Sequence, residues 1–158
     1  MKKLLRDTRG AVYVEFLAVF MPLFLFFLSL VQLIFVQTAS LITSHAAMTA
    51  VRAAVVVIHD DPAMYGGTAE GNASGPRLTD ITRAAAIPLS ALGPEGEGLT
   101  VDAGGPYGRD QMVTVTVTYD YKCRIPGGAF FVCGPSGVKT LTAEATMPNQ
   151  GAEYKYGK

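Results

Sequence analysis

A long apolar run dominates the hydrophobic pattern at the start of the chain. Between Phe16 and Val51 the sequence contains no Asp, Glu, Lys or Arg. Within residues 16–36 the apolar side chains are interrupted only by Pro22, Ser29 and Gln32. As a helix, this stretch would be about 32 Å long, enough to cross a hydrocarbon core of about 30 Å. A buried helix of a soluble protein rarely runs that far without a polar face, so the pattern predicts a transmembrane helix.

The helical pattern continues beyond the apolar run. Residues 37–59 mix small and polar side chains with apolar ones, and several alanines offer a smooth surface for helix packing. Asp60, Asp61 and Pro62 then favour a stop, because the residue before a proline avoids the helical region. A metal site at His59, Asp60 and Asp61 is the alternative, but no second cluster of ligands is in view. We therefore interpret this segment as the end of the helix.

Shorter elements are expected in the second half of the chain. Residues 78–86 predict a helix with Thr79 or Asp80 near its start, and Pro88 should end or kink it. Alternating apolar and polar residues predict two strands, at 113–122 and 140–147, and residues 99–103 show a brief alternating stretch. We expect a small antiparallel sheet with one apolar face, covered by the outer half of the first helix. The predicted fold class is α+β, with the sheet packed on a long N-terminal helix.

Charge and length restrict the function. The 158 residues suffice for one ordinary domain and a short accessory segment. Four of the 13 basic residues stand in the first ten positions, which predicts a cytoplasmic N-terminus and an exported remainder. The remainder has no basic stripe, so nucleic acid is not an expected partner.

No catalytic, cofactor-binding or metal-binding constellation is evident. The two histidines, His45 and His59, lie on or near the first helix, and Ser136 has no evident partner base. A nucleophilic triad is therefore not expected, and we predict that the chain is not an enzyme and needs no cofactor.

The chain has two cysteines, Cys123 and Cys133, both in the predicted exported part. An oxidising compartment favours a disulfide bond between them, which would close a hairpin-like loop. Two free buried thiols or half of a metal site are the alternatives, although the neighbouring residues offer no further metal ligands.

One carboxylate stands at the edge of the apolar run. Glu15 follows the junction Arg9-Gly10-Ala11 and precedes Phe16, where a bilayer would begin. An ionisable group at that depth is costly and usually functional. A plain membrane anchor gains nothing from it, so Glu15 is the best indication of function in this sequence.

These residues resemble the start of a prepilin: a basic leader ends in glycine, and glutamate follows at the fifth place. The run from Gly10 to Leu23 is similar to the TadE-like pseudopilins of tight-adherence (Tad, Flp-type) pilus systems, in which a Glu-Phe pair precedes an apolar stretch with a proline. The resemblance covers roughly the first 55 residues. Major Flp pilins are much shorter and usually carry Glu-Tyr, which favours a minor pilin here. TadE and TadF types remain open alternatives.

The resemblance implies cleavage by a prepilin peptidase between Gly10 and Ala11. The new α-amino group would be mostly protonated at neutral pH, and Glu15 lies one helical turn further on. The carboxylate can then pair with this amine or with that of a neighbouring subunit. Ala11, Glu15 and Phe16 are thus the expected assembly residues, and other pilin subunits, Tad-type inner-membrane proteins and membrane lipid are the expected partners.

The resulting organisation is that of a single-pass protein of the bacterial inner membrane with a periplasmic domain, which can enter an extracellular pilus after assembly. The expected segments are a cleaved leader (1–10), a transmembrane helix (11–36), its exported continuation (37–59), an exported α+β domain (60–147) and a loose tail (148–158). Two alternatives stay open. One is a binding module on an ordinary membrane anchor. The other is a secretory signal cleaved near Ser44-His45-Ala46.

Overall fold

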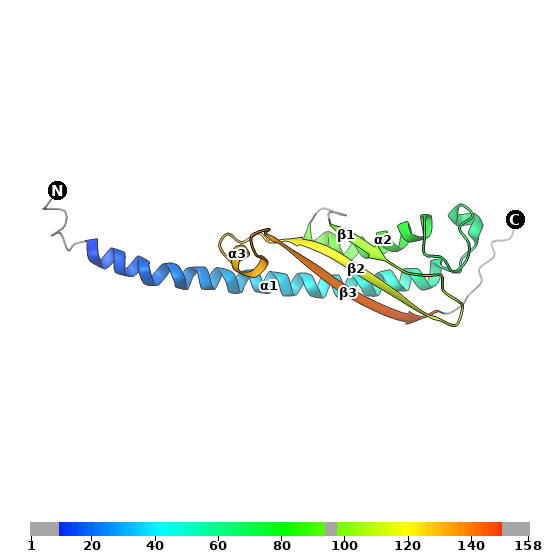
Figure 1. The fold of residues 1–158 in the computed structure, drawn as a ribbon, viewed down its shortest axis with the longest axis horizontal. Helices are drawn as coiled ribbons and strands as arrows, with labels where there is room; N and C mark the ends of the chain where they lie inside the picture. Colours follow the sequence, from blue (N-terminus) through cyan, green and yellow to red (C-terminus); the bar gives the residue numbers. More distant parts are fainter. Residues whose placement is uncertain (1–9, 94–97, 150–158) are drawn as a thin grey trace. The chain divides into compact units, whose positions relative to one another are not determined.

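Helix α1 (Ala11–Val57) is the longest element of the computed structural model, which describes residues 10–93 and 98–149 (Figure 1). Its 47 residues run without interruption through Pro22. The predicted continuation of the apolar helix through the segment 37–59 is therefore confirmed almost to its end. The predicted leader, up to residue 9, and the tail from residue 150 onward lie outside the described residues.

The described residues divide into two compact units. The first contains residues 10–35 and 122–138, and the second contains 36–93, 98–121 and 139–149. Helix α1 contributes its first half to one unit and its second half to the other. Each unit is described by itself below.

A three-stranded antiparallel sheet forms much of the second unit. Its strands, in the order in which they pair, are β1 (Leu99–Asp102), β2 (Met112–Lys122) and β3 (Val138–Pro148). Leu99 pairs with Tyr119 and Asp102 with Thr116. The α+β class and the small antiparallel sheet predicted from the sequence are confirmed.

Strand β2 shows the alternation that predicted it. Val113, Val115 and Val117 are fully buried, whereas the threonines between them are partly exposed. On the threonine face, hydroxyl groups join β2 to β3: the Oγ1 atoms of Thr114 and Thr146 are 2.9 Å apart. One face of the sheet is thus apolar and the other polar, as expected.

The apolar core of the second unit combines this sheet with two helices. Helix α1 contributes Ala46, Ala47, Ala50, Val51 and Ala54, all fully buried. Helix α2 (Pro76–Leu89) contributes Ile81 and Ala85. Small side chains allow close approach, and the Thr49 hydroxyl of α1 donates to the Ala84 carbonyl of α2 at 3.1 Å. The alanine-rich outer half of α1 is therefore a packing surface.

The predicted start of the second helix was wrong. Helix α2 begins at Pro76, after Gly75 as the N-cap residue, and not near Thr79 or Asp80. Proline suits the first helical position because its fixed φ is preorganised and its missing N–H has no partner to lose there. Pro88 lies in the last turn, and the helix ends at the next residue.

Arg77 closes the C-terminal end of α1. Its buried guanidinium donates to the carbonyl of Val57, and to those of Asp60 at 2.8 Å and Thr68 at 3.2 Å. The same group lies 4.5 Å from the centroid of the Tyr65 ring. The last carbonyls of a helix have no partner within it, and a cation is favoured at that end. Arg77 supplies both the donors and the charge.

Backbone atoms join two loops to this helix end. The Gly71 N–H donates to the Ile58 carbonyl at 2.9 Å, and the Tyr107 N–H donates to the Gly71 carbonyl at 2.8 Å. Gly71 has a φ of 83°, and a Cβ atom there would stand 2.7 Å from the Tyr107 carbonyl oxygen. Both the conformation and the space require glycine.

Candidate membrane-spanning and assembly site

The predicted processing bond lies at the start of α1. Helix α1 begins at Ala11, directly after the exposed Gly10. No described atom lies within 4 Å of the place that a Gly10 Cβ would occupy. The Gly10–Ala11 bond thus stands where the regular helix begins.

Glu15 lies in the second turn of α1 and is exposed. It stands four residues after Ala11, so the two positions share one face of the helix. Within residues 10–93 and 98–149, Glu15 makes no hydrogen bond or ion pair. Its carboxylate is therefore exposed and without a partner among the described residues.

The first half of α1 carries apolar side chains on its exposed surface. Exposed fractions include 72% for Val12, 61% for Phe16 and 62% for Phe26. Phe16 stacks on Phe20, and Phe20 on Phe24, with ring centroids 5.3 and 5.6 Å apart. Such a surface is unfavourable in water and indicates contact with lipid or with other apolar helices.

Among the described residues, α1 is the one helix long and apolar enough to cross a membrane. Its most apolar 18 residues have a mean hydropathy of 2.6 and are mostly exposed. The core helix of a soluble protein would be mostly buried, so this exposure agrees with the transmembrane helix predicted from the sequence.

The two cysteines lie at disulfide distance, as predicted. Cys123 and Cys133 are joined, with their Cα atoms 6.6 Å apart. The segment between them was expected to be a connection, but it contains a short helix, α3 (Gly128–Cys133). We use the name disulfide loop for residues 123–133.

The disulfide loop is bound to α1 through Gln32. The Gln32 side chain is fully buried, and its Oε1 accepts a 3.0 Å hydrogen bond from the Ile125 N–H. Next to this bond, the Gly128 backbone lies directly against the Leu28 carbonyl, so that a Cβ atom would collide with it. Sequence reasoning missed the role of Gln32, although a lone amide in an apolar helix was a usable signal.

His59, Asp60 and Asp61, the alternative metal site, follow the end of α1 at Val57. Asp60 Oδ1 accepts from the Asp61 N–H at 2.8 Å, and Asp61 Oδ1 accepts from the Ala63 N–H at 2.9 Å, which caps η3 (Pro62–Tyr65). No group of three metal-ligating side chains gathers anywhere in the described part of the chain. The interpretation as a helix terminus fits this geometry.

His59 is buried beside this terminus without a hydrogen-bond partner for either ring nitrogen among the described residues. Burial lowers the pKa of His59, and the positive charge of Arg109 lowers it further. Burial also raises the pKa of Tyr65, as does the nearby Asp60 carboxylate. Charging either side chain is thus disfavoured in the folded chain.

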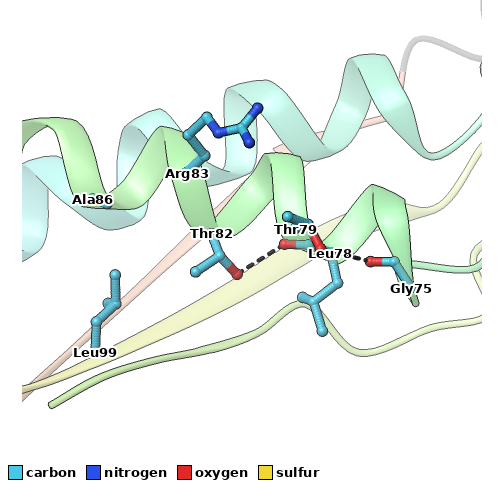
Figure 2. A pocket seen from close by; sticks show the side chains of 7 residues that line it. All are labelled: Gly75, Leu78, Thr79, Thr82, Arg83, Ala86 and Leu99. Carbon is cyan, nitrogen blue, oxygen red and sulfur yellow. Dashed lines mark hydrogen bonds between the residues drawn. The ribbon is translucent and has the colours of Figure 1, made fainter. Parts of the chain in front are cut away.

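A shallow depression of about 570 Å³ lies between α2 and the first strand. Figure 2 shows that Thr79 and Thr82 use their hydroxyls within the helix, on the Gly75 and Leu78 carbonyls. The remaining lining is mainly apolar, and Arg83 stands at its edge, 3.5 Å from Asp80. The depression offers a contact surface and no nucleophile with a partner base.

No family model matches this chain, and no curated protein or solved structure does so either.

Proposed function

We propose that this chain is a TadE-like minor pilin or pseudopilin that inserts by α1 into a Tad-type pilus or a related secretion assembly. One observation carries the proposal: an exposed carboxylate, Glu15, stands one turn after the first residue of an exposed apolar helix. From there to Val51 no other charge interrupts the helix. An isolated charge on a surface meant for lipid or other helices needs a partner.

The proposed partner is made by processing. A prepilin peptidase cuts between Gly10 and Ala11 and leaves a positive amine on Ala11. In the bilayer, the amine of one subunit and Glu15 of its neighbour form an ion pair, which fixes the axial register of the two helices because any other register leaves both charges unpaired. The aromatic row from Phe16 to Phe24 then supplies apolar packing at the same level.

The proposed location follows from the same helix. The leader faces the cytoplasm, α1 crosses the inner membrane, and the second unit with its sheet lies in the periplasm or, after assembly, on the pilus. Prepilin peptidase, other pilin subunits and inner-membrane assembly proteins are the proposed partners. No catalytic step is assigned to the chain.

The test separates processing from assembly. Gly10→Val should leave a full-length precursor, whereas Glu15→Gln should be cut normally and lose most of its incorporation into the assembly. Glu144→Gln, an exposed acid of β3, is the matched control and should behave as the unaltered chain. Mass spectrometry of the mature N-terminus measures cleavage, and quantitative immunoblotting of sheared surface material measures incorporation. Normal incorporation of Glu15→Gln would exclude the assembly role.

A second candidate is a periplasmic binding module on a plain anchor. The observation in its favour is the depression beside α2, whose Leu78, Ala86 and Leu99 give an apolar floor. On this hypothesis Gly10 is not cut, and the mature chain starts at Met1. The same mass measurement therefore decides between the two functions.

A further inference from the structure

The disulfide loop carries an exposed apolar tip. Phe130 and Phe131 of α3 are 63% and 65% exposed, and their rings meet edge to face with centroids 5.6 Å apart. Two neighbouring phenylalanines exposed to this degree are unusual on a surface that faces water. The tip indicates an apolar environment outside the chain.

The loop sits at a defined distance along α1. Its contacts are with Leu25, Leu28 and Gln32, all within the first unit. Leu25, Leu28 and Gln32 stand 14, 17 and 21 residues after Ala11, or about 21, 26 and 32 Å along the helix. A hydrocarbon core is about 30 Å thick. If the core begins at Ala11, the first residue of the expected transmembrane segment, it ends between Leu28 and Gln32, within the stretch of α1 that the loop contacts.

The charges in and beside the disulfide loop agree with a position at the membrane surface. Residues 122–138 include Lys122, Arg124 and no acidic side chain, and Arg124 is exposed. Aromatic residues and cations gather where a membrane protein leaves the hydrocarbon and enters the headgroups. Phe26, Phe27 and Leu30, which lie at the same level of α1 as the residues that contact the loop, are exposed and apolar as well.

We propose that the disulfide loop is a membrane-interface anchor. Phe130 and Phe131 enter the outer leaflet of the membrane that α1 crosses, and Arg124 faces the lipid phosphates. The loop backbone stays packed on α1 beside Leu28 and Gln32, near the outer end of the span, since unpaired peptide groups are too costly in hydrocarbon. This inference rests on the membrane insertion in the proposed function, but it does not depend on processing or on pilus assembly.

The chain contains no tryptophan, so a single introduced one reports its own surroundings. The probe variant is Phe131→Trp in the full chain, reconstituted into phosphatidylethanolamine and phosphatidylglycerol vesicles. Phe26→Trp is the control for the span, and Ile87→Trp, on the exposed surface of α2, is the control for water. Quenching by spin-labelled lipids and by aqueous acrylamide is measured for each variant.

Trp at position 131 should be quenched most by lipids labelled near the headgroup, at least about twofold more than Trp at position 87. Quenching of position 131 by acrylamide alone, with position 26 quenched by lipid, overturns the anchor and leaves the span intact. Protection of position 131 from both quenchers also overturns it, since a protein partner would then cover the tip. Failure of lipid to quench position 26 refutes the membrane insertion on which both proposals depend.

Discussion

Gln32 of α1 accepts a hydrogen bond through its side-chain oxygen from the backbone N–H of Ile125, 93 residues later in the chain. The bond is part of a dry contact, because the Gln32 side chain is fully buried. It joins the apolar helix to the disulfide loop at one point. A buried N–H without a partner is costly, so this amide gives the loop a preferred position on α1.

Gln32→Leu should loosen the disulfide loop. Leucine keeps the apolar contact but leaves the Ile125 N–H unpaired, which costs about 1–3 kcal/mol. The open form of the loop should then be populated at least about fivefold more, and a thiol reductant should reach the Cys123–Cys133 bond faster by that factor. The measurement is the rate of reduction by dithiothreitol in detergent micelles. Gln37→Leu, at an exposed position of α1, is the control and should leave the rate unchanged.

Gly128→Ala should have a similar effect by steric means. The added methyl group meets the backbone carbonyl of Leu28, which cannot move aside without breaking helix α1. We expect faster reduction of the disulfide bond and faster hydrogen exchange at Ala129. Gly108→Ala is the control, because a Cβ there makes ordinary contacts with the Gln111 side chain. Equal rates in both variants would contradict the close packing of α3 on α1.

Arg77→Met should destabilise the second unit. The substitution leaves the carbonyls of Val57, Asp60 and Thr68 without their donor, and we expect the free energy of unfolding to fall by about 3 kcal/mol. Arg83→Met removes only an exposed pair with Asp80 and should cost less than about 1 kcal/mol. Urea unfolding in detergent, followed by circular dichroism, compares the two. Similar losses would mean that Arg77 does not hold the end of α1.

His59 predicts a dependence of stability on pH. Its pKa in the folded chain is lowered, chiefly by burial, so the unfolded chain binds the proton first as the pH falls. The stability contribution is therefore complete above the unfolded pKa of about 6.5 and is lost as the pH falls through the folded pKa. The free energy of unfolding should be lower at about pH 5.5 than at about pH 7.5.

His59→Leu should reduce this difference, because leucine fills the buried site and does not titrate. His45→Gln replaces the chain's other histidine, which is exposed on α1, and should keep the difference. A pH dependence that persists in His59→Leu would assign the effect to other groups.

The sequence predicted the long helix and the two longer strands, β2 and β3, because their patterns extend over many residues. Strand β2 shows this best, since the alternation that begins at Val113 repeats over the whole element. The start of α2 was misplaced because Thr79 and Asp80 are good cap residues, and the stronger signal was Pro76 after Gly75. The cap preferences of Thr79 and Asp80 favoured a later start of the helix, but Pro76 at the first helical position determined where α2 begins.

Two other features depend on tertiary contacts that no short pattern reveals. Helix α3 has six residues, too few for a period, and it lies against α1 through Gly128. Arg77 carries no local signal, since the carbonyls that it binds lie 9 to 20 residues earlier. By contrast, Glu15 stood out from the sequence because a charge beside a long apolar run is conspicuous. Gly10 stood out because it ends the basic leader at the expected distance before Glu15.

The hydrogen bonds that join Gly71 to Ile58 and Tyr107 to Gly71 use main-chain atoms only. Every residue type except proline offers the same N–H and carbonyl groups. These two attachments to the helix end therefore do not depend on which side chains the loops carry, although the Tyr107 hydroxyl makes a separate contact, donating to the Thr114 carbonyl at 3.0 Å. Gly71 itself is fixed, because both its φ and the space beside it require glycine. A substitution at Gly71 should accordingly disrupt this junction, whereas a change of a loop side chain that makes no contact of its own should preserve it.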